Sequence, residues 1–403
     1  MQPWFERFLA SDPIRAAAER ISTSDEDTLA DQMELTAIPA PPFQEEERGR
    51  EMAARMAAAG LHEVGVDGVG NVLGWWPQQA GAAPVVLSAH LDTVFGPEIP
   101  IEVRRDGDRI TGPGISDDGR GLAVILAVAR ALSAMRFQAG DGVMPQRPIL
   151  FAATVGEEGA GDLRGARHLL GPDGAAHGAA AFLSIDGAGL DRIIRRGVGS
   201  RRFRAIFRGP GGHSWADWGR VNPLHAMGAA VARLGALAEN LPARAALTAA
   251  RMGGGTSVNA IAQEAWCELD LRSEDESALD ELELQVREIL EEGRRTEEVR
   301  SRGELTLEVA TLGRRPAGAT PRRHPLVRAA EDATRAVGIE PVGAAASTDA
   351  NAAMALGIPA VTLGGGGRAG GAHTTGEWYE NRDGPQGVLR ALLTLLLAAG
   401  PQV

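Results

Sequence analysis

The chain contains no lysine and only one cysteine among its 403 residues. Its 41 cationic side chains are therefore all arginine, and 53 acidic residues leave a net charge of −12. This balance argues against a nucleic-acid-binding face, which requires an excess of positive charge. The single cysteine, Cys267, excludes an intrachain disulfide framework and a zinc site built from thiolates. Because Cys267 lies in an alternating strand pattern, we expect it to pack in a core.

Long hydrophobic runs are also missing. The first residues contain neither the basic region nor the apolar stretch that a signal peptide requires. The apolar run 389–399 includes Arg390 and is too short to cross a bilayer. We therefore expect a soluble, cytoplasmic protein with no membrane partner. A chain of this length exceeds what one hydrophobic core normally supports, so we expect two domains.

Short apolar runs alternate with helical patterns in the first half of the chain. The runs 85–89, 149–155 and 182–185 predict buried strands, and residues 122–135 predict a buried helix. This alternation favours a largely parallel sheet covered by helices on both faces. Residues 12–60 predict two amphipathic helices separated by a proline cluster.

The pattern changes between residues 198 and 312. Elements in that segment follow the order strand, helix, strand, strand, helix, strand, which indicates a ferredoxin-like α+β domain. Residues 313–403 return to the α/β pattern. We therefore predict that residues 1–197 and 313–403 form one α/β domain into which the smaller domain is inserted.

Polar segments follow several predicted strands, at the edge of the sheet where the functional side chains of α/β proteins usually lie. In chain order these segments are 89–94, 115–119, 155–159, 184–187 and 372–377. Their imidazole and carboxylate groups suit a borderline-soft divalent cation such as zinc. A shared carboxylate can hold two such cations about 3.5–4 Å apart. Together the segments predict a site for two metal ions.

The first two segments contain a histidine and three aspartates. Asp92 stands two residues after His90, where it can accept the second ring N–H of a histidine that binds a metal. One of the adjacent Asp117 and Asp118 could bridge two cations while the other forms hydrogen bonds elsewhere. An aspartate-rich turn that caps the following helix is the alternative. The spacing alone does not choose between the two aspartates.

The other three segments supply further carboxylates and a second histidine. Glu157 and Glu158 can point in different directions, so that one binds a metal ion and the other transfers a proton. Asp186 ends an apolar strand and is a further ligand candidate. His373 follows the glycine-rich loop 364–371, whose N–H groups could hold an anion. That loop lacks the P-loop pattern, so we expect no nucleotide site.

Taken together, the segments resemble the M20 family of metallopeptidases, which includes carboxypeptidase G2, aminoacylase, acetylornithine deacetylase and peptidase T. The resemblance covers nearly the whole chain. It implies a zinc-exopeptidase-like α/β catalytic domain, and it implies that the inserted domain is a lid and dimerisation domain. A homodimer formed through that domain is expected from the same resemblance.

The resemblance also assigns roles by position. It implies five metal ligands: His90, Asp117, Glu158, Asp186 and His373. Asp117 would be shared by two ions, for which zinc is favoured, with cobalt and manganese as alternatives. One ion would contact His90, Asp117 and Asp186, and the other Asp117, Glu158 and His373. Glu157 would be the general base, and Asp92 would orient His90.

Three residues of the inserted domain match substrate-contacting positions of the family. His213 matches a histidine that contacts the substrate carbonyl, often in the site of the partner subunit. Asn259 and Arg272 match substrate-holding positions, and the arginine fork suits a carboxylate. For Arg272, a strand-surface residue is an equal alternative. The chain departs from the family at Gly119 and Arg120, since many members have Asp-Asp-Lys-Gly where this chain has Asp-Gly-Arg-Gly at 118–121.

The resemblance implies hydrolysis of an amide bond in a small peptide, with water activated between two cations and Glu157 as general base. An alternative with the same site is a deacylase or desuccinylase that acts on N-acyl amino acids. A homologue that binds metal or peptide without catalysis is a remote alternative, because all seven matched site residues, including Glu157, are present.

Overall fold

The computed structural model describes residues 3–77, 81–136 and 143–400. The chain divides into two compact units, one formed by residues 1–197 and 319–403 and the other by residues 198–318. The inserted unit extends beyond position 312, where the sequence placed its end. The reason is that the last strand of this unit, β14 (Thr306–Arg315), continues past that position.

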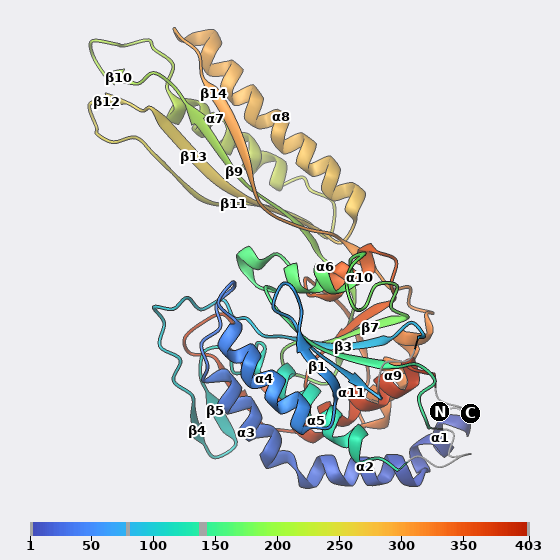
Figure 1. The fold of residues 1–403 in the computed structure, drawn as a ribbon. Coiled ribbons are helices and arrows are strands. Elements are labelled where there is room, and N and C mark those ends of the chain that lie inside the picture. Colours follow the sequence, from blue (N-terminus) through green and yellow to red (C-terminus); the bar gives the residue numbers. More distant parts are fainter. Residues whose placement is uncertain (1–2, 78–80, 137–142, 401–403) are drawn as a thin grey trace. The chain divides into compact units, whose positions relative to one another are not determined.

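The large unit contains a mixed sheet of nine strands within the described residues (Figure 1). The strand order is β1 (His62–Val66), β2 (Val72–Trp76), β6 (Ile149–Thr154), β3 (Val85–His90), β7 (Ala181–Ile185), β17 (Ala360–Leu363), β8 (Arg192–Gly197) and β15 (Gly318–Ala319), and β16 (Val342–Ala346) pairs with β8. Strands β6, β3, β7 and β17 are parallel to one another. Their carboxyl ends therefore meet at one edge of the sheet, as the sequence predicted.

Both faces of these central strands are covered, because successive side chains alternate between two apolar layers. Val85, Leu87 and Ala89 of β3 face a layer that includes α5 (Gly119–Ala134) and α11 (Gly384–Ala398). Val86 faces the opposite layer, with α6 (Arg164–Leu170) and α10 (Ala350–Ala355). This arrangement confirms the predicted α/β class.

The remaining helices of the large unit are α1 (Pro3–Ala10), α2 (Asp12–Thr23), α3 (Asp25–Thr36), α4 (Glu46–Ala58) and α9 (Pro325–Ala336). The prediction of two helices in residues 12–60 is wrong, because this fully described stretch contains three. Ser24, with φ −103° and ψ 23°, leaves the helical conformation between α2 and α3. No helix in the described part of the chain is both long and apolar enough to cross a bilayer.

A small antiparallel sheet brings distant segments of the large unit together. Its strand order is β18 (Arg368–Gly370), β19 (Trp378–Glu380), β5 (Arg109–Thr111) and β4 (Arg104–Asp106). Trp378 of β19 pairs with Thr111 of β5. The segment 372–377 consequently lies beside the residues that lead into 115–119, although more than 250 residues separate them.

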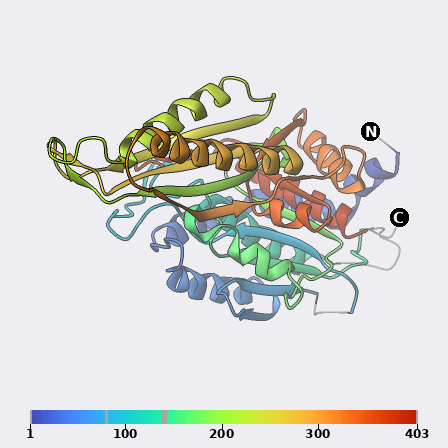
Figure 2. The same ribbon diagram turned by 90° about the horizontal axis from the view of Figure 1, so that it is seen from above.

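The small unit has the ferredoxin-like order that the sequence predicted. Along the chain its elements are β9 (Gly199–Arg208), α7 (Pro223–Ala238), β11 (Ala245–Gly254), β13 (Glu264–Ser273), α8 (Glu276–Arg300) and β14. The sheet order is β11-β13-β9-β14, with antiparallel neighbours. Helices α7 and α8 lie side by side on one face of this sheet (Figures 1 and 2). Cys267 is buried beneath them, as expected for a core cysteine.

Candidate metal centre

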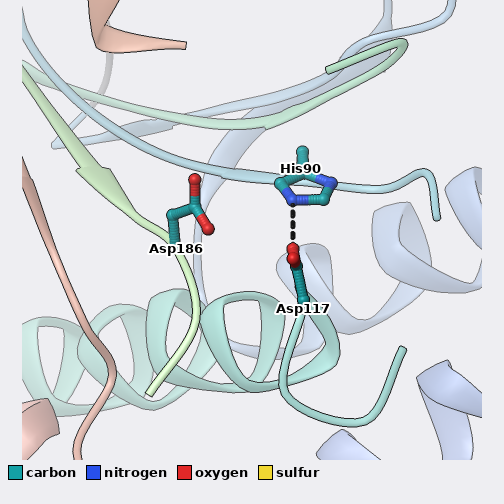
Figure 3. Close-up of side chains that lie close together, drawn as sticks. All are labelled: His90, Asp117 and Asp186. Carbon is teal, nitrogen blue, oxygen red and sulfur yellow. Dashed lines mark hydrogen bonds and ion pairs between the residues drawn. The ribbon is translucent and has the colours of Figure 1, made fainter. Parts of the chain in front are cut away.

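Three parallel strands place polar side chains at the same edge of the large sheet. His90 is the last residue of β3, Asp186 directly follows β7, and Glu157 and Glu158 come shortly after β6. Asp117 precedes α5 and reaches the same place. Figure 3 shows the polar groups of His90, Asp117 and Asp186 turned toward a common space.

The five predicted ligands form two overlapping groups. Ligand atoms of His90, Asp117 and Asp186 lie within 4.8 Å of one another, and so do those of Asp117, Glu158 and His373. Asp117 belongs to both groups. Its Oδ1 is 3.0 Å from His90 Nε2, and its Oδ2 is 3.2 Å from His373 Nε2. A carboxylate between two imidazoles has the position that a bridge between two cations requires.

The two adjacent aspartates have different surroundings. Asp118 Oδ1 accepts hydrogen bonds from the N–H groups of Gly121 at 2.9 Å and Gly187 at 3.2 Å, and Oδ2 accepts from that of His90 at 3.0 Å. Asp118 therefore caps α5 and ties its start to two strand ends. Burial raises the pKa of Asp118 well above its ordinary value. Burial also opposes ionisation of Asp117, but hydrogen bonds with His373 and His90 lower its pKa.

Asp92 contacts His90 and also the two glutamates. His90 Nδ1 is 2.9 Å from the main-chain carbonyl oxygen of Asp92 and 3.6 Å from its Oδ1. The carboxylate also accepts the N–H of Glu157 at 2.9 Å and that of Glu158 at 2.8 Å. Asp92 is fully buried, so these amides satisfy its charge. It thereby fixes the backbone of both glutamates against the strand that ends in His90.

The two glutamates diverge after a glycine turn. Gly156 has a φ of +63°, and a Cβ there would lie 2.7 Å from the side chain of Arg164, so only glycine fits without displacement. Glu158 Oε1 lies 2.9 Å from His373 Nε2. Glu157 is 4% exposed and forms a third close group with His90 and Glu158. One glutamate therefore faces the second histidine, and the other faces the first.

His373 follows the glycine-rich loop 364–371 and has a left-handed backbone conformation, with φ +64°. Hydrogen bonds with Asp117 and Glu158 raise its pKa to about 10. The loop does not offer its first N–H groups to an anion, because Gly365 and Gly366 donate to the carbonyl oxygens of residues 187 and 189. The suggested anion cradle is therefore wrong for these positions.

Two buried arginines hold the same loop. Arg120 donates from Nε to the Gly365 carbonyl at 2.8 Å and from an NH2 nitrogen to that of Gly384 at 2.9 Å. Arg390 donates to the carbonyl of Gly364. Arg120, which marks the departure from the family pattern, thus links α5 to the loop that leads to His373.

Glu377 is a further residue of the centre, and no function was predicted for it. Its fully buried carboxylate accepts N–H bonds from Gly114 at 2.9 Å, Ser116 at 2.8 Å and Asp117 at 2.9 Å, and the Ser116 hydroxyl at 2.6 Å. Burial raises its pKa. All these donors lie at least 260 residues earlier in the chain, so no local pattern reveals them. Glu377 fixes the loop that presents Asp117.

Replacing Glu377 with glutamine should weaken cation binding about 10- to 100-fold, the usual effect of losing an outer partner of a ligand. The amide NH2 of glutamine would face an N–H donor, so the loop around Asp117 must shift. Cation affinity can be measured by competition with a chromophoric chelator. Glu380→Gln, which changes a carboxylate of β19 paired with Arg382 at 3.1 Å, is the matched control and should bind normally. Equal affinity in both variants would contradict the role of Glu377.

The charges of the centre fit divalent cations. Seven of the predicted site residues gather there, five with carboxylates and two with imidazoles: Asp92, Asp117, Glu157, Glu158, Asp186, His90 and His373. Burial raises the pKa of Asp186 well above its usual range, and repulsion by Asp117 adds to the shift. The buried guanidinium of Arg48 donates to the carbonyls of residues 36, 38 and 91. Imidazole and carboxylate donors without thiolate match zinc, cobalt or manganese.

The three candidates in the small unit do not all lie together. Ser214 N donates to the Asn259 carbonyl at 3.0 Å beside the pairing of β10 (Gly212–His213) with β12 (Ala260–Ile261), so His213 and Asn259 are neighbours. Arg272 lies near the C-terminal end of β13, whereas Asn259 and β12 precede the first residue of that strand. The Arg272 Nε donates to Asp270 at 3.0 Å.

The ring of His213 is held in one orientation. Its Nδ1 accepts the backbone N–H groups of Trp215 at 3.2 Å and Ala216 at 3.3 Å. A nitrogen that accepts hydrogen bonds carries no proton, so the neutral ring carries its proton on Nε2. His213 therefore presents an N–H donor from an exposed side chain.

Comparisons with known proteins agree with this architecture. A model described as Peptidase family M20/M25/M40 matches residues 86–397. A search of curated proteins gives no match.

Among solved structures, the aminopeptidase PepT of Bacillus cereus is 22% identical with a TM-score of 0.71, and the match covers 95% of this chain and 98% of that one. A tripeptidase of Staphylococcus aureus is 22% identical with a TM-score of 0.72, and the match covers 93% and 96% of the two chains. The Bacillus subtilis YXEP protein, a dinuclear metal binding peptidase from the M20 family, is 17% identical with a TM-score of 0.68, and the match covers 94% and 98%. At these identities the structural matches show a shared fold.

Proposed function

The chain belongs to the peptidase family M20/M25/M40, and from this membership we propose that it hydrolyses an amide bond of small peptides with two bound divalent cations, zinc being favoured. The observation that carries the proposal is the position of Asp117 between His90 and His373, in two overlapping groups of ligand atoms. The peptidase activities named for the similar structures support the choice of peptides as substrates.

We assign His90, Asp117 and Asp186 to one cation and Asp117, Glu158 and His373 to the other. When bound, such cations polarise a carbonyl oxygen and make water acidic enough to ionise near neutral pH. The donors of each group come from separate elements, so the folded large unit, and not a local motif, assembles both groups.

Glu157 is the proposed general base. Its backbone is fixed by Asp92, and its buried carboxylate lies within the group that contains His90. It accepts a proton from the attacking water and later donates that proton to the leaving nitrogen. Asp92 is proposed to orient His90, whose Nδ1 lies 2.9 Å from its carbonyl oxygen, and to hold Glu157 and Glu158 in place through their N–H groups.

His213 is proposed to stabilise the substrate oxygen as it becomes negative. Because its Nδ1 accepts two backbone N–H groups, the neutral ring carries its proton on Nε2. An N–H donor of this kind can stabilise an oxyanion. Asn259, beside it, and Arg272 are proposed to hold the substrate. We further propose that the small unit is a lid that forms a homodimer, so that His213 reaches the site of the partner subunit.

A single set of assays tests the proposed function. Protein stripped with a chelator should hydrolyse nothing, and reloading with zinc, cobalt or manganese should restore cleavage of di- or tripeptides together with two bound ions. A panel of N-acyl amino acids is assayed in parallel. Cleavage of these compounds alone would identify the deacylase alternative. Two bound ions without hydrolysis of any substrate would contradict the enzyme and indicate a binding protein.

A further inference from the structure

Phe43 occupies a backbone position that usually belongs to glycine. Gln44 N donates to the Pro41 carbonyl at 2.9 Å and closes a turn in which Pro42 and Phe43 are the central residues. Phe43 has φ +72°, as the third residue of a type II turn requires. A bulky side chain with positive φ is strained. Its ring is nevertheless 63% exposed, so burial within the fold does not offset the strain.

We propose that Phe43 is a specificity-determining residue whose ring forms an apolar side of the substrate site. The substrates it selects are amides with a large aliphatic or aromatic group next to the scissile bond. The inference rests on the proposed function, since it names the substrate class of the same site. Strain retained at an exposed side chain is typical of residues that contact a ligand.

The turn lies against the segment that contains the first histidine. Thr93 N donates to the Ala40 carbonyl at 2.9 Å, and Thr93 directly follows Asp92. A Cβ on Gly114 would lie 2.7 Å from the Thr93 side chain, so Thr93 also packs on the loop that leads to Asp117. The neighbouring Val94 is an apolar side chain with 38% exposure. The Phe43 turn is therefore adjacent to the segment that carries the first ligand, and that segment packs on the loop that leads to Asp117.

Arg164 connects the ring of Phe43 to the general base. The guanidinium carbon lies 4.9 Å from the centre of the Phe43 ring, in a cation–π contact. The same guanidinium is held by both Glu45 oxygens at 2.7 Å and by the Val69 carbonyl at 2.6 Å. The Arg164 stem packs on Gly156, which directly precedes Glu157. One fixed side chain thus lies between the Phe43 ring and Gly156, the residue that precedes Glu157.

This arrangement leaves an apolar surface that an apolar substrate group can contact. One face of the ring is covered by Arg164, whose two terminal nitrogens are engaged by Glu45 and Val69, and the residue as a whole is 63% exposed. A polar or charged substrate group would gain no hydrogen-bond partner from the ring. An aliphatic or aromatic group would bury apolar surface against the ring, and removing that surface from water is favourable.

The test compares Phe43→Ala with the unchanged protein, both loaded with metal, on pairs of substrates that differ in one residue. Each pair has glycine or alanine in one member and leucine or phenylalanine at the same position in the other. We expect Phe43→Ala to lower kcat/KM for the large apolar member about tenfold, through KM, with little change for the small member. Phe43→Leu should keep most of the preference.

A second variant separates the ring from the strain. Phe43→Gly relieves the positive φ and should raise the melting temperature, yet it should lose the same preference as Phe43→Ala. Equal loss of kcat/KM for all substrates, or an unchanged preference in Phe43→Ala, would overturn the inference while leaving the proposed function intact. Failure of the unchanged, metal-loaded protein to hydrolyse any member of the panel would overturn both.

Discussion

Replacing Glu157 with glutamine should lower kcat by about 10²- to 10⁴-fold while both cations remain bound. Glutamine keeps the size of the side chain and one acceptor oxygen but cannot accept the proton from water. Its backbone would still be fixed by Asp92 at 2.9 Å. Neither proposed ligand group includes Glu157. Metal content by elemental analysis and kcat at saturating substrate measure the two effects separately.

The neighbouring residue provides the matched control. Glu158→Gln changes the carboxylate that lies 2.9 Å from His373 Nε2, so it should lose cation affinity as well as activity. The geometry also allows Glu157 to bind a cation, because Glu157 forms a close group with His90 and Glu158. Loss of an ion from Glu157→Gln would make it a ligand, and retention of most activity would remove it as the base.

The parts of the site that the sequence revealed are those fixed by strand ends. β3, β6 and β7 are short, nearly continuous apolar runs, which is the sequence pattern of parallel strands that are buried on both faces. The polar residue after each run must lie at the carboxyl edge of a parallel sheet. His90, Asp186 and the two glutamates could therefore be placed in one location before any coordinates were known.

What the sequence could not reveal are contacts between distant segments. Glu377 is defined by donors in the loop before α5, and Arg120 by carbonyls of the glycine-rich loop. The Asp92 carboxylate accepts the two amides after β6 as well as lying 3.6 Å from His90, and only the contact with His90 was expected from the local sequence. A sequence pattern relates residues that are close along the chain. Each of these three contacts instead depends on which strands and loops become adjacent in the folded protein.

The choice between two adjacent aspartates shows the same limit, and it leads to the second prediction. Asp117→Asn should eliminate the binding of a second cation and lower turnover on the order of 10³-fold, because several kcal/mol of charge stabilisation depend on that cation. An amide presents one oxygen, whereas Asp117 directs one oxygen toward each histidine, at 3.0 and 3.2 Å.

Asp118→Asn is the same substitution one residue later, with a different expected result. Asparagine is as good a helix cap as aspartate, so the bonds from Gly121 and Gly187 can persist. Its NH2 group would oppose the His90 N–H, which leaves a buried donor without a partner and costs about 1–3 kcal/mol of folding stability. The variant should therefore melt at a lower temperature yet still bind two ions. If Asp118→Asn lost the second cation and Asp117→Asn kept it, the bridge would have to be reassigned, because only one of two neighbouring carboxylates can face both histidines.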